Sequence, residues 1–259
     1  MRFTVSNRDD ENSLYIKNKI IDLLLQQGWE YSKNNPEIII CVGGDGTILR
    51  AIHEYIGNLD TACFVGLHTG TLGFLTDYVQ EELDTFIHDL INNKSKIEER
   101  PLLEVSFPEK NETIYSFNEV RIESITRTLL LDIFIDGEFF EQTRGSGICI
   151  STQAGSSAIN RALSGAVVDS GIDVLQLCEI MPITNKKHHS LRNPYIMRED
   201  RKIIVKGQGD GLKSAHAAYD YMDRKLTDIS EIHIQTSIKK VRFARYRTYS
   251  YLKRLKNIY

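Results

Sequence analysis

The chain has 259 residues, with 32 lysines and arginines, 35 aspartates and glutamates, 41% hydrophobic residues and 26% charged residues. This balance is typical of a globular protein and excludes a mostly disordered chain. The length suits one large domain or two small ones. No stretch approaches the roughly 18 consecutive apolar residues of a membrane-spanning helix. Acidic residues near the start stand where a signal peptide needs an apolar run, so we expect no export signal.

The net charge of −3 is unevenly distributed. Residues 239–259 contain eight basic residues and no acidic one, so the remainder carries a net charge of −11. A basic tail can contact nucleic acid or phosphate, but it more often stays solvated or pairs with acidic surface. We expect this tail to close the fold, with its charge facing acidic groups of the same chain or of a neighbouring subunit.

The four cysteines are far apart in the sequence and form no CxxC pair. We expect them to be buried thiols in a reducing compartment, which predicts a cytoplasmic protein. They are Cys41, Cys63, Cys149 and Cys178.

Strand and helix signals alternate over the first hundred residues. Apolar runs predict strands, and apolar residues at helical spacing predict helices between them. This alternation is typical of right-handed βαβ units on a parallel sheet, so we predict a Rossmann-like α/β domain over residues 1–99. The expected strands are Phe3–Val5, Glu37–Val42 and Ala62–Leu67, and the expected helices are Ser13–Gln27, Ile48–Ile56 and Glu81–Asn93.

After Pro101 the pattern changes to short strands, interrupted by one helix over Ser156–Leu163. Asp136-Gly137 between two of the strands is a hairpin signal. We therefore predict a β-sandwich-like domain over residues 100–238, with residues 239–259 packing back on the first domain. The expected strands are Leu102–Phe107, Thr113–Phe117, Thr128–Ile135, Phe139–Thr143, Gly147–Ser151, Lys202–Lys206, Glu231–Thr236 and Lys239–Arg245.

The strongest chemical signal is Gly43-Gly44-Asp45-Gly46-Thr47, directly after a buried strand and before a helix. Glycines let the backbone approach a ligand, and the free N–H groups of a helix N-terminus suit a phosphate. An aspartate there would repel an anion, so Asp45 is expected either to hold Mg²⁺ with the phosphates or to accept a proton from an attacking hydroxyl. The structural alternative is a tight turn with Asp45 as the helix N-cap. The turn is neither a P-loop nor a GxGxxG fingerprint.

Two further turns extend this signal. Gly66–Phe74 is glycine-rich and follows the next parallel strand, so it should join the first turn at the edge of the sheet. Phe74 there could contact a base or simply plug the sheet. Arg144–Gly147 and Ser151–Asn160 form a cluster of glycines and small hydroxyl residues that enters a helix, which predicts a second N-terminal cradle. Plain capping turns are the alternative for this cluster.

Two weaker candidates complete the set. Asn118-Glu119 follows an aromatic strand, and an amide beside a carboxylate can bind a ribose diol. Taken alone, this dipeptide is uninformative. His188-His189 could bind a metal, but without an acid or cysteine at ligand spacing a surface loop is the better interpretation.

In their order along the chain, these motifs resemble those of NAD kinases. The GGDGT turn, the HTGxLGF-type turn, the Asn-Glu pair and the arginine-glycine-serine cluster all occur, and Val241–Arg247 is similar to the end of the compact NAD kinases of Gram-positive bacteria. GGDGT alone is shared with diacylglycerol and sphingosine kinases and, more loosely, with phosphofructokinases. The resemblance implies a kinase that uses ATP, or in some members polyphosphate, and Mg²⁺ to phosphorylate the 2′-hydroxyl of the adenosine ribose of NAD.

The resemblance also assigns roles to individual residues. Asp45 would be the catalytic base, with the metal carried by the nucleotide and no fixed protein ligand. The nucleotide and phosphate set would be Gly43, Gly44, Asp45, Gly46, Thr47 and Arg50. The NAD-binding set would be Phe74, Asn118, Glu119, Arg144, Ser146, Ala154, Ser157, Ala158, Ile159, Asn160, Arg161, Ala162 and Asp220. The site is expected between the domains of a homo-oligomer, in which a neighbouring subunit contributes, with no nucleic acid or membrane as a partner.

The sequence departs from the family pattern on the dinucleotide side. Ser146 stands where the family has aspartate, Gln153-Ala154 where it has proline and a hydroxyl residue, Ile159 where it has tyrosine, and Thr71 where it often has histidine. Loss of an aromatic contact or of a charged hydrogen bond weakens binding by about 1–3 kcal/mol. Two alternatives therefore remain: a weakened relative that senses NAD or adenosine, and a lipid or small-metabolite kinase with the same GGDGT turn.

Overall fold

The computed structural model describes residues 1–184, 190–209 and 212–256 and divides into two compact units. Unit 1 comprises residues 1–100 and 239–259, and unit 2 comprises residues 101–238. The chain passes from one unit to the other within two long strands, β6 (Lys96–Phe107) and β17 (Glu231–Arg245). No helix among the described residues is both long and apolar enough to cross a membrane.

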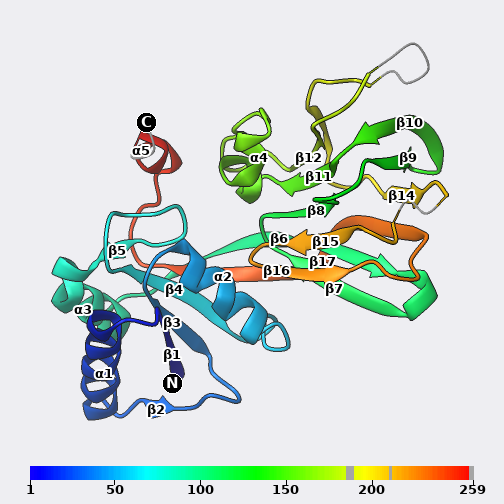
Figure 1. Ribbon diagram of the computed structural model, residues 1–259. Helices are drawn as coiled ribbons and strands as arrows, with labels where there is room; N and C mark the ends of the chain where they lie inside the picture. The colour runs from blue at the N-terminus through cyan, green and yellow to red at the C-terminus, as the bar shows by residue number, and fades with distance from the viewer. Residues whose placement is uncertain (185–189, 210–211, 257–259) are drawn as a thin grey trace. The chain divides into compact units, whose positions relative to one another are not determined.

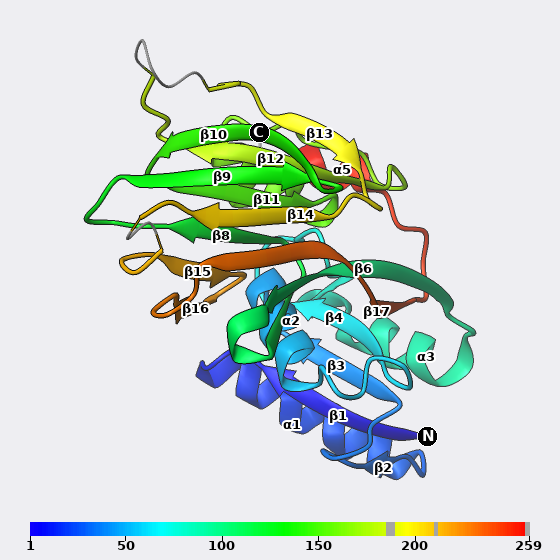
Figure 2. The ribbon, with the colours of Figure 1, turned by 90° about the vertical axis from the view of Figure 1, so that its right-hand side faces the viewer.

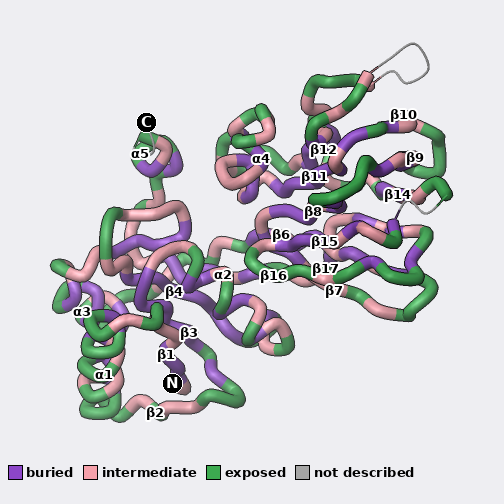
Figure 3. Tube along the Cα trace, in the orientation of Figure 1, coloured by how far each residue is buried: buried purple, intermediate pink, exposed green. Residues whose placement is uncertain are grey.

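Unit 1 is built on a parallel sheet, in the order β17-β4-β3-β1-β2, with β5 paired to β4 (Figure 1). β3 is buried along its whole length, whereas α1 exposes one side (Figure 3). The strands are β1 (Arg2–Asn7), β2 (Glu30–Tyr31), β3 (Ile38–Val42), β4 (Cys63–His68) and β5 (Tyr78–Val79), and the α-helices are α1 (Glu11–Gln26), α2 (Asp45–Glu54), α3 (Leu83–Asn92) and α5 (Tyr251–Leu255).

Successive side chains of the buried strands point to opposite faces of the sheet, and helices cover both faces. Ile38, Ile40 and Val42 of β3 pack in one core cluster with apolar side chains of α1 and α3. Ile48 of α2 approaches Gly66 of β4, where an added Cβ would lie 2.8 Å from the Ile48 side chain. Helix α1 begins two residues earlier than we expected because the Asp10 carboxylate caps it, accepting the Ser13 N–H at 2.9 Å.

Unit 2 consists of two antiparallel sheets around one core (Figure 2). One sheet has the order β10-β9-β14-β17, with β6 paired to β17 and β7, and the other has the order β13-β12-β11-β8-β15-β16. The remaining strands are β7 (Glu112–Ser116), β8 (Glu119–Glu123), β9 (Leu129–Ile135), β10 (Glu138–Gly145), β11 (Gly147–Thr152), β12 (Val174–Ile180), β13 (Tyr195–Arg198), β14 (Ile203–Gly207), β15 (His216–Tyr219) and β16 (Met222–Lys225).

The turn between β9 and β10 is the expected hairpin, with Asp136 and Gly137 at φ of 52° and 85°. The expected helix over Ser156–Leu163 is wrong. A 3₁₀ turn, Ala154–Ser157, precedes a single helical turn, α4 (Ile159–Ala162). The chain leaves the helical conformation at Ala158, with a φ of −88° and a ψ of −135°, and the buried Ser156 hydroxyl accepts the Val168 N–H at 3.0 Å, which ties the 3₁₀ turn to the following segment. The glycine and hydroxyl cluster of Ser151–Asn160 therefore does not lead into a long helix, and the predicted anion-binding helix N-terminus is absent from this described segment.

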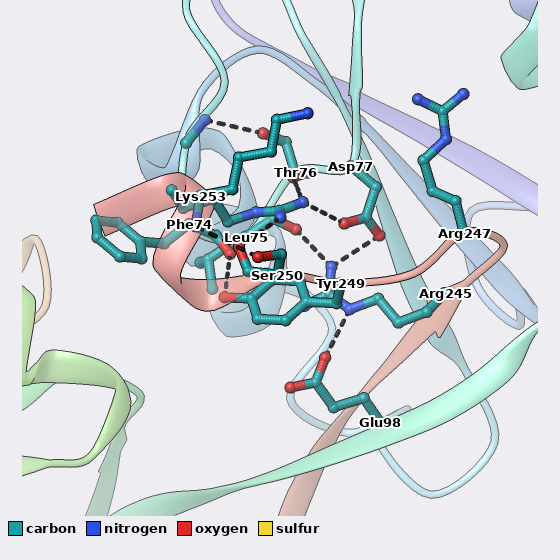
Figure 4. Close-up of polar contacts among 12 residues, drawn as sticks. Phe74, Leu75, Thr76, Asp77, Glu98, Arg245, Arg247, Tyr249, Ser250 and Lys253 are labelled. Atoms are coloured by element: carbon teal, nitrogen blue, oxygen red, sulfur yellow. Dashed lines mark hydrogen bonds and ion pairs between the residues drawn. The ribbon is translucent and has the colours of Figure 1, made fainter. Parts of the chain in front are cut away.

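A buried ion cluster fixes the C-terminal segment within unit 1 (Figure 4). The Asp77 carboxylate accepts one hydrogen bond from Arg245 at 2.9 Å and one from Arg254 at 2.6 Å, and all three side chains are at most 6% exposed. Arg245 also pairs with Glu98 at 2.6 Å. Two buried cations thus share one buried anion, and the charge of the tail meets acidic groups of its own unit.

Replacing Asp77 tests how much this cluster stabilises the fold. Asp77→Asn leaves Arg254 without its counter-charge, and removal of one partner of a buried pair costs about 3–5 kcal/mol. We expect a loss of this size in the free energy of unfolding, measured by urea denaturation. Glu37→Gln breaks the exposed Arg2–Glu37 pair, whose side chains are 42% and 48% exposed, and is the control. It should cost less than about 1 kcal/mol. Equal losses would contradict the assigned role of the cluster.

Candidate functional site

Two glycine-rich turns meet at the carboxyl edge of the sheet in unit 1. β3 and β4 are parallel neighbours, and the N–H of Gly43, just after β3, donates to the carbonyl of Leu67 in β4 at 3.0 Å. Gly43 has a φ of 150°, and an added Cβ would lie 2.3 Å from the Thr47 hydroxyl. Only glycine fits there, so the chain can turn directly from β3 into α2.

Asp45 is the first residue of α2, and its carboxylate is held by the other turn. One oxygen accepts the N–H of Phe74 at 2.8 Å, and the other accepts the N–H of Leu75 at 3.0 Å. Gly73 makes room for this contact, because an added Cβ would lie 2.4 Å from Asp45 Oδ1. The helix N-cap is Gly44 and has no side-chain hydrogen bond, so the alternative that Asp45 caps the helix is wrong.

Backbone donors lie beside this carboxylate. Thr47 donates its N–H to the Gly44 carbonyl at 2.9 Å, which leaves the N–H groups of Asp45 and Gly46 as the first two of α2 without an intrahelical acceptor. Gly46 is exposed, and Gly44 and Asp45 are partly exposed. A phosphate can therefore reach these donors and the positive end of the helix dipole.

His68 is a residue of this site that our sequence analysis did not select. Its Nδ1 accepts the Gly70 N–H at 2.8 Å, and an added Cβ at Gly44 would lie 3.2 Å from its Nε2. Burial lowers the pKa of His68, although the charge of Asp45 opposes this, so the neutral ring is favoured and Nε2 carries the proton. Its position at the end of β4, directly before the glycine-rich turn, could have marked His68 as a candidate site residue in the sequence.

Two other residues proposed for unit 1 already have protein partners. The Arg50 guanidinium is exposed and donates to the carbonyl of Asn7. The Phe74 ring packs against Tyr251, with ring centroids 5.4 Å apart. These contacts support a packing role for Phe74 in this structure, whereas Arg50 remains accessible at the surface.

In unit 2, Asp220 organises the turn that carries Asn118. Its carboxylate accepts hydrogen bonds from the Ser116 hydroxyl at 2.9 Å, the Phe117 N–H at 2.8 Å and the Asn118 N–H at 2.7 Å. Asp220 itself has a φ of 50°, a left-handed conformation that aspartate tolerates in turns. Both of its oxygens are thus engaged by the backbone and side chains of residues 116–118.

Glu119 is a buried carboxyl group beside this turn. It is 4% exposed, and its Oε2 has no hydrogen-bond partner among the residues that the structure describes. Burial, with the nearby charge of Asp220, raises the pKa of Glu119 to about 8. At neutral pH its carboxyl group is therefore mainly protonated and can donate a hydrogen bond.

The segment around α4 packs directly against Asn118. An added Cβ at Gly155 would lie 2.1 Å from the Asn118 carbonyl, and the Thr152 hydroxyl donates to the Phe117 carbonyl at 2.8 Å. Asn160 is fully buried and accepts a hydrogen bond from the Cys178 thiol at 3.1 Å. Of the other residues proposed here, Ala154, Ser157, Ala158 and Ile159 are partly exposed, and Arg161 and Ala162 are exposed.

The structure does not bring Arg144 and Ser146 to this group. They precede β11, whereas Thr152, which contacts Asn118, ends it. Five residue steps separate the two ends of this strand, about 17 Å at 3.4 Å per residue. Arg144 is exposed, and the Ser146 hydroxyl lies 3.8 Å from the Met181 sulfur.

Within the described ranges, no three His, Cys, Asp or Glu side chains gather where they could hold a metal ion. His188 and His189, the weak metal candidates, lie outside the described residues.

Comparison with known proteins decides the family. The model of the ATP-NAD kinase N-terminal domain matches residues 5–95. NAD kinase 1 of Bacillus subtilis is 36% identical over 261 residues, which cover 99% of this chain and 97% of that protein. NAD kinase of Leuconostoc mesenteroides is 36% identical over 264 residues, which cover 100% of this chain and 98% of that protein. The chain belongs to the NAD kinase family.

Solved structures of NAD kinases share the fold. Yeast NADH kinase complexed with NADH superposes with a TM-score of 0.83 at 18% identity, covering 100% of this chain and 87% of that one. An NAD kinase from Archaeoglobus fulgidus in complex with ATP gives 0.78 at 22% identity, covering 100% and 97%. The predicted fold class, an α/β domain with a β-sandwich-like domain, is confirmed, as are the family resemblance and the prediction of a kinase.

Titration of Glu119 gives a prediction for the stability of this NAD kinase family member. Between its usual pKa near 4.5 and its folded value of about 8, the folded state holds a proton that the unfolded state has lost. Raising the pH through this window should therefore lower the free energy of unfolding, by up to about 1.4 kcal/mol per pH unit. Glu119→Gln keeps a neutral side chain, so it should flatten this slope and exceed the wild type in stability at pH 8.

The measurement is urea denaturation from pH 5 to pH 8. Glu123→Gln is the control, because Glu123 lies on the same strand and pairs with Arg121 at 2.7 Å. It should keep the wild-type slope. A Glu119→Gln variant with the wild-type slope would show that Glu119 is not protonated in the folded state.

Proposed function

We propose that the protein transfers the γ-phosphoryl group of ATP to the 2′-hydroxyl of the adenosine ribose of NAD, giving NADP. Membership of the NAD kinase family supports this reaction. The observation that carries the proposal is the position of Asp45, whose carboxylate is fixed by two backbone N–H groups beside the start of α2. A carboxylate and anion-binding N–H groups are thus neighbours, as phosphoryl transfer to a hydroxyl requires.

The donor phosphates would bind at the start of α2. The N–H groups of Asp45 and Gly46 would meet the phosphate oxygens, with Gly43 and Gly44 shaping the turn and Thr47 holding it. Nε2–H of His68, over Gly44, is a further donor to the same anion. Arg50 is an exposed cation on the same helix, suited to the outer phosphates.

Asp45 would act as the catalytic base. Its carboxylate takes the proton of the ribose 2′-hydroxyl as the oxygen attacks the γ-phosphorus. The bond between that phosphorus and its bridging oxygen breaks, and ADP leaves with the electron pair. Mg²⁺ bound to the phosphates would supply charge neutralisation. Each Asp45 oxygen accepts one backbone N–H and keeps further acceptor capacity for the proton of the hydroxyl.

Residues of unit 2 would bind NAD. Asn118 and Glu119 suit a ribose diol or an amide, since one side chain offers both a donor and an acceptor and the other is a neutral carboxyl at pH 7. Asp220 fixes the turn on which Asn118 stands, and Ala154, Ser157, Ala158 and Ile159 offer the accessible surface beside it. Arg161 and Ala162 extend this surface, whereas Asn160 supports it from within.

We further propose a cytoplasmic homo-oligomer. Four free, buried cysteines are typical of a reducing compartment. Ile125 and Ile238 are 99% and 95% exposed, but single exposed apolar side chains are common, so the proposal of an oligomer rests on the family resemblance. In that assembly a neighbouring subunit would add to the NAD site, and Arg144 and Ser146, remote from Asn118 along β11, are the residues most suited to serve such a neighbour.

Incubation of the protein with Mg-ATP and NAD tests the reaction. We expect the wild type to form NADP, and Asp45→Asn to lower kcat by about 10²–10⁴-fold with little change in either KM, because general-base catalysis contributes that much. Tight NAD binding without turnover would instead favour the sensor, which the replacements at Ser146 and Ile159 suggest. Phosphorylation of a different alcohol only would favour a lipid or small-metabolite kinase.

A further inference from the structure

The C-terminal segment contacts the turn whose N–H groups hold Asp45. Each of the three carbonyl groups of residues 74–76 accepts a hydrogen bond from a side chain of this segment (Figure 4). Tyr249 donates to residue 74 at 3.0 Å, Arg245 to residue 75 at 3.1 Å, and Arg254 to residue 76 at 2.8 Å. Three consecutive carbonyl groups of an irregular turn thus each accept a hydrogen bond from a residue 170 to 178 positions further along the chain.

One of these bonds lies on the same peptide group as an Asp45 contact. The carbonyl of Phe74 and the N–H of Leu75 belong to one planar peptide unit. The Tyr249 hydroxyl binds the carbonyl end of this unit at 3.0 Å, and Asp45 Oδ1 binds its N–H end at 3.0 Å. Hydrogen bonds at both ends fix the plane of the unit and strengthen each other.

The Tyr249 side chain is itself rigidly placed. Its ring centroid lies 4.2 Å from the guanidinium carbon of Arg254 and 4.6 Å from that of Arg245. These cations are the ones that share the buried carboxylate of Asp77. The hydroxyl therefore points at the Phe74 carbonyl from a support that is held independently of Asp45.

We propose that Tyr249 is a positioning residue for the catalytic carboxylate, acting through the peptide group between Phe74 and Leu75. The inference rests on the proposed role of Asp45 as the base. The C-terminal segment then contributes to the reaction as well as to the stability of unit 1, because it sets the orientation of the Leu75 N–H group that binds the Asp45 carboxylate.

Removing one hydroxyl tests this role. Tyr249→Phe keeps the ring and its contacts with both guanidinium groups but deletes the bond to the Phe74 carbonyl. Tyr246→Phe is the matched control, since it deletes a hydroxyl of the same segment that binds Ser95 instead. We expect Tyr249→Phe to lower kcat about three- to tenfold, the range for one hydrogen bond, with both KM values within about twofold. Tyr246→Phe should keep the wild-type kcat.

A double-mutant cycle with Asp45→Asn separates positioning from general support of the fold. In Asp45→Asn the base is missing, so the orientation of the side chain at position 45 no longer affects the rate. Tyr249→Phe should therefore lower the residual rate of Asp45→Asn no further. An equal loss in both backgrounds, or a kcat equal to that of Tyr246→Phe, would overturn the inference. If the wild type forms no NADP, or if Asp45→Asn keeps full activity, the proposed function itself fails.

A structural measurement covers the case in which Tyr249→Phe is less stable. Amide hydrogen exchange in the folded protein reports the Phe74 and Leu75 N–H groups directly. Both should exchange faster in Tyr249→Phe than in Tyr246→Phe. Equal exchange rates would contradict the assigned link.

Discussion

The two backbone hydrogen bonds that hold the Asp45 carboxylate are the interaction on which the site in unit 1 depends. A carboxylate at the start of a helix normally caps that helix. Here the N–H groups of Phe74 and Leu75 take both oxygens, so the first N–H groups of α2 remain available to an anion. Gly73 permits this contact, since no other residue would leave space for the carboxylate. The turn at Phe74 and Leu75 thus holds the Asp45 carboxylate, while the N–H groups at the start of α2 stay unbonded within the helix.

Support for that turn comes from charge burial. Asp77 directly follows the turn and pairs with both Arg245 and Arg254. The same two arginines donate hydrogen bonds to the carbonyl groups of Leu75 and Thr76 in the turn. Buried pairs of this kind contribute little net stability, but their geometry is unforgiving because an unpaired partner is costly. The cluster therefore specifies one arrangement of the turn.

In unit 2, the Asp220 carboxylate holds the turn that carries Asn118 by accepting three hydrogen bonds from residues 116–118.

Local signals predicted the α/β unit well. Continuous apolar runs such as Ile38–Val42 occur in strands buried on both faces, and GGDGT stands at the expected strand-to-helix turn. Unit 2 was predicted less completely. Strands β8, β12, β13, β15 and β16 were not predicted, and the two strands expected over Glu231–Thr236 and Lys239–Arg245 form the single strand β17. Buried polar residues such as Glu119 in β8 and Gln176 in β12 interrupt the apolar pattern. The helix expected at Ser156 is instead a 3₁₀ turn followed by one helical turn, because the backbone leaves the helical conformation at Ala158.

Long-range pairings could not be predicted from the sequence. Nothing local to Tyr249 or Arg254 indicates a hydrogen bond to residues 74 and 76, and nothing local to Asp45 indicates that Phe74 and Leu75 hold it. Likewise, the raised pKa of Glu119 arises from its burial near Asp220, 101 positions away along the chain. Such contacts depend on the sheet order, which brings together turns that the sequence separates.

Gly73→Ala tests the placement of the Asp45 carboxylate directly, because its methyl group would lie 2.4 Å from Asp45 Oδ1 and must displace the carboxylate. Gly57→Ala is the control, since an added Cβ there meets nothing within 4 Å. We expect Gly73→Ala to lower kcat for NADP formation by at least about 10²-fold, as for a misplaced catalytic group, while both variants keep the thermal midpoint of the wild type to within a few degrees. A Gly73→Ala variant with the kcat of Gly57→Ala would show that the position of the Asp45 carboxylate does not control the reaction.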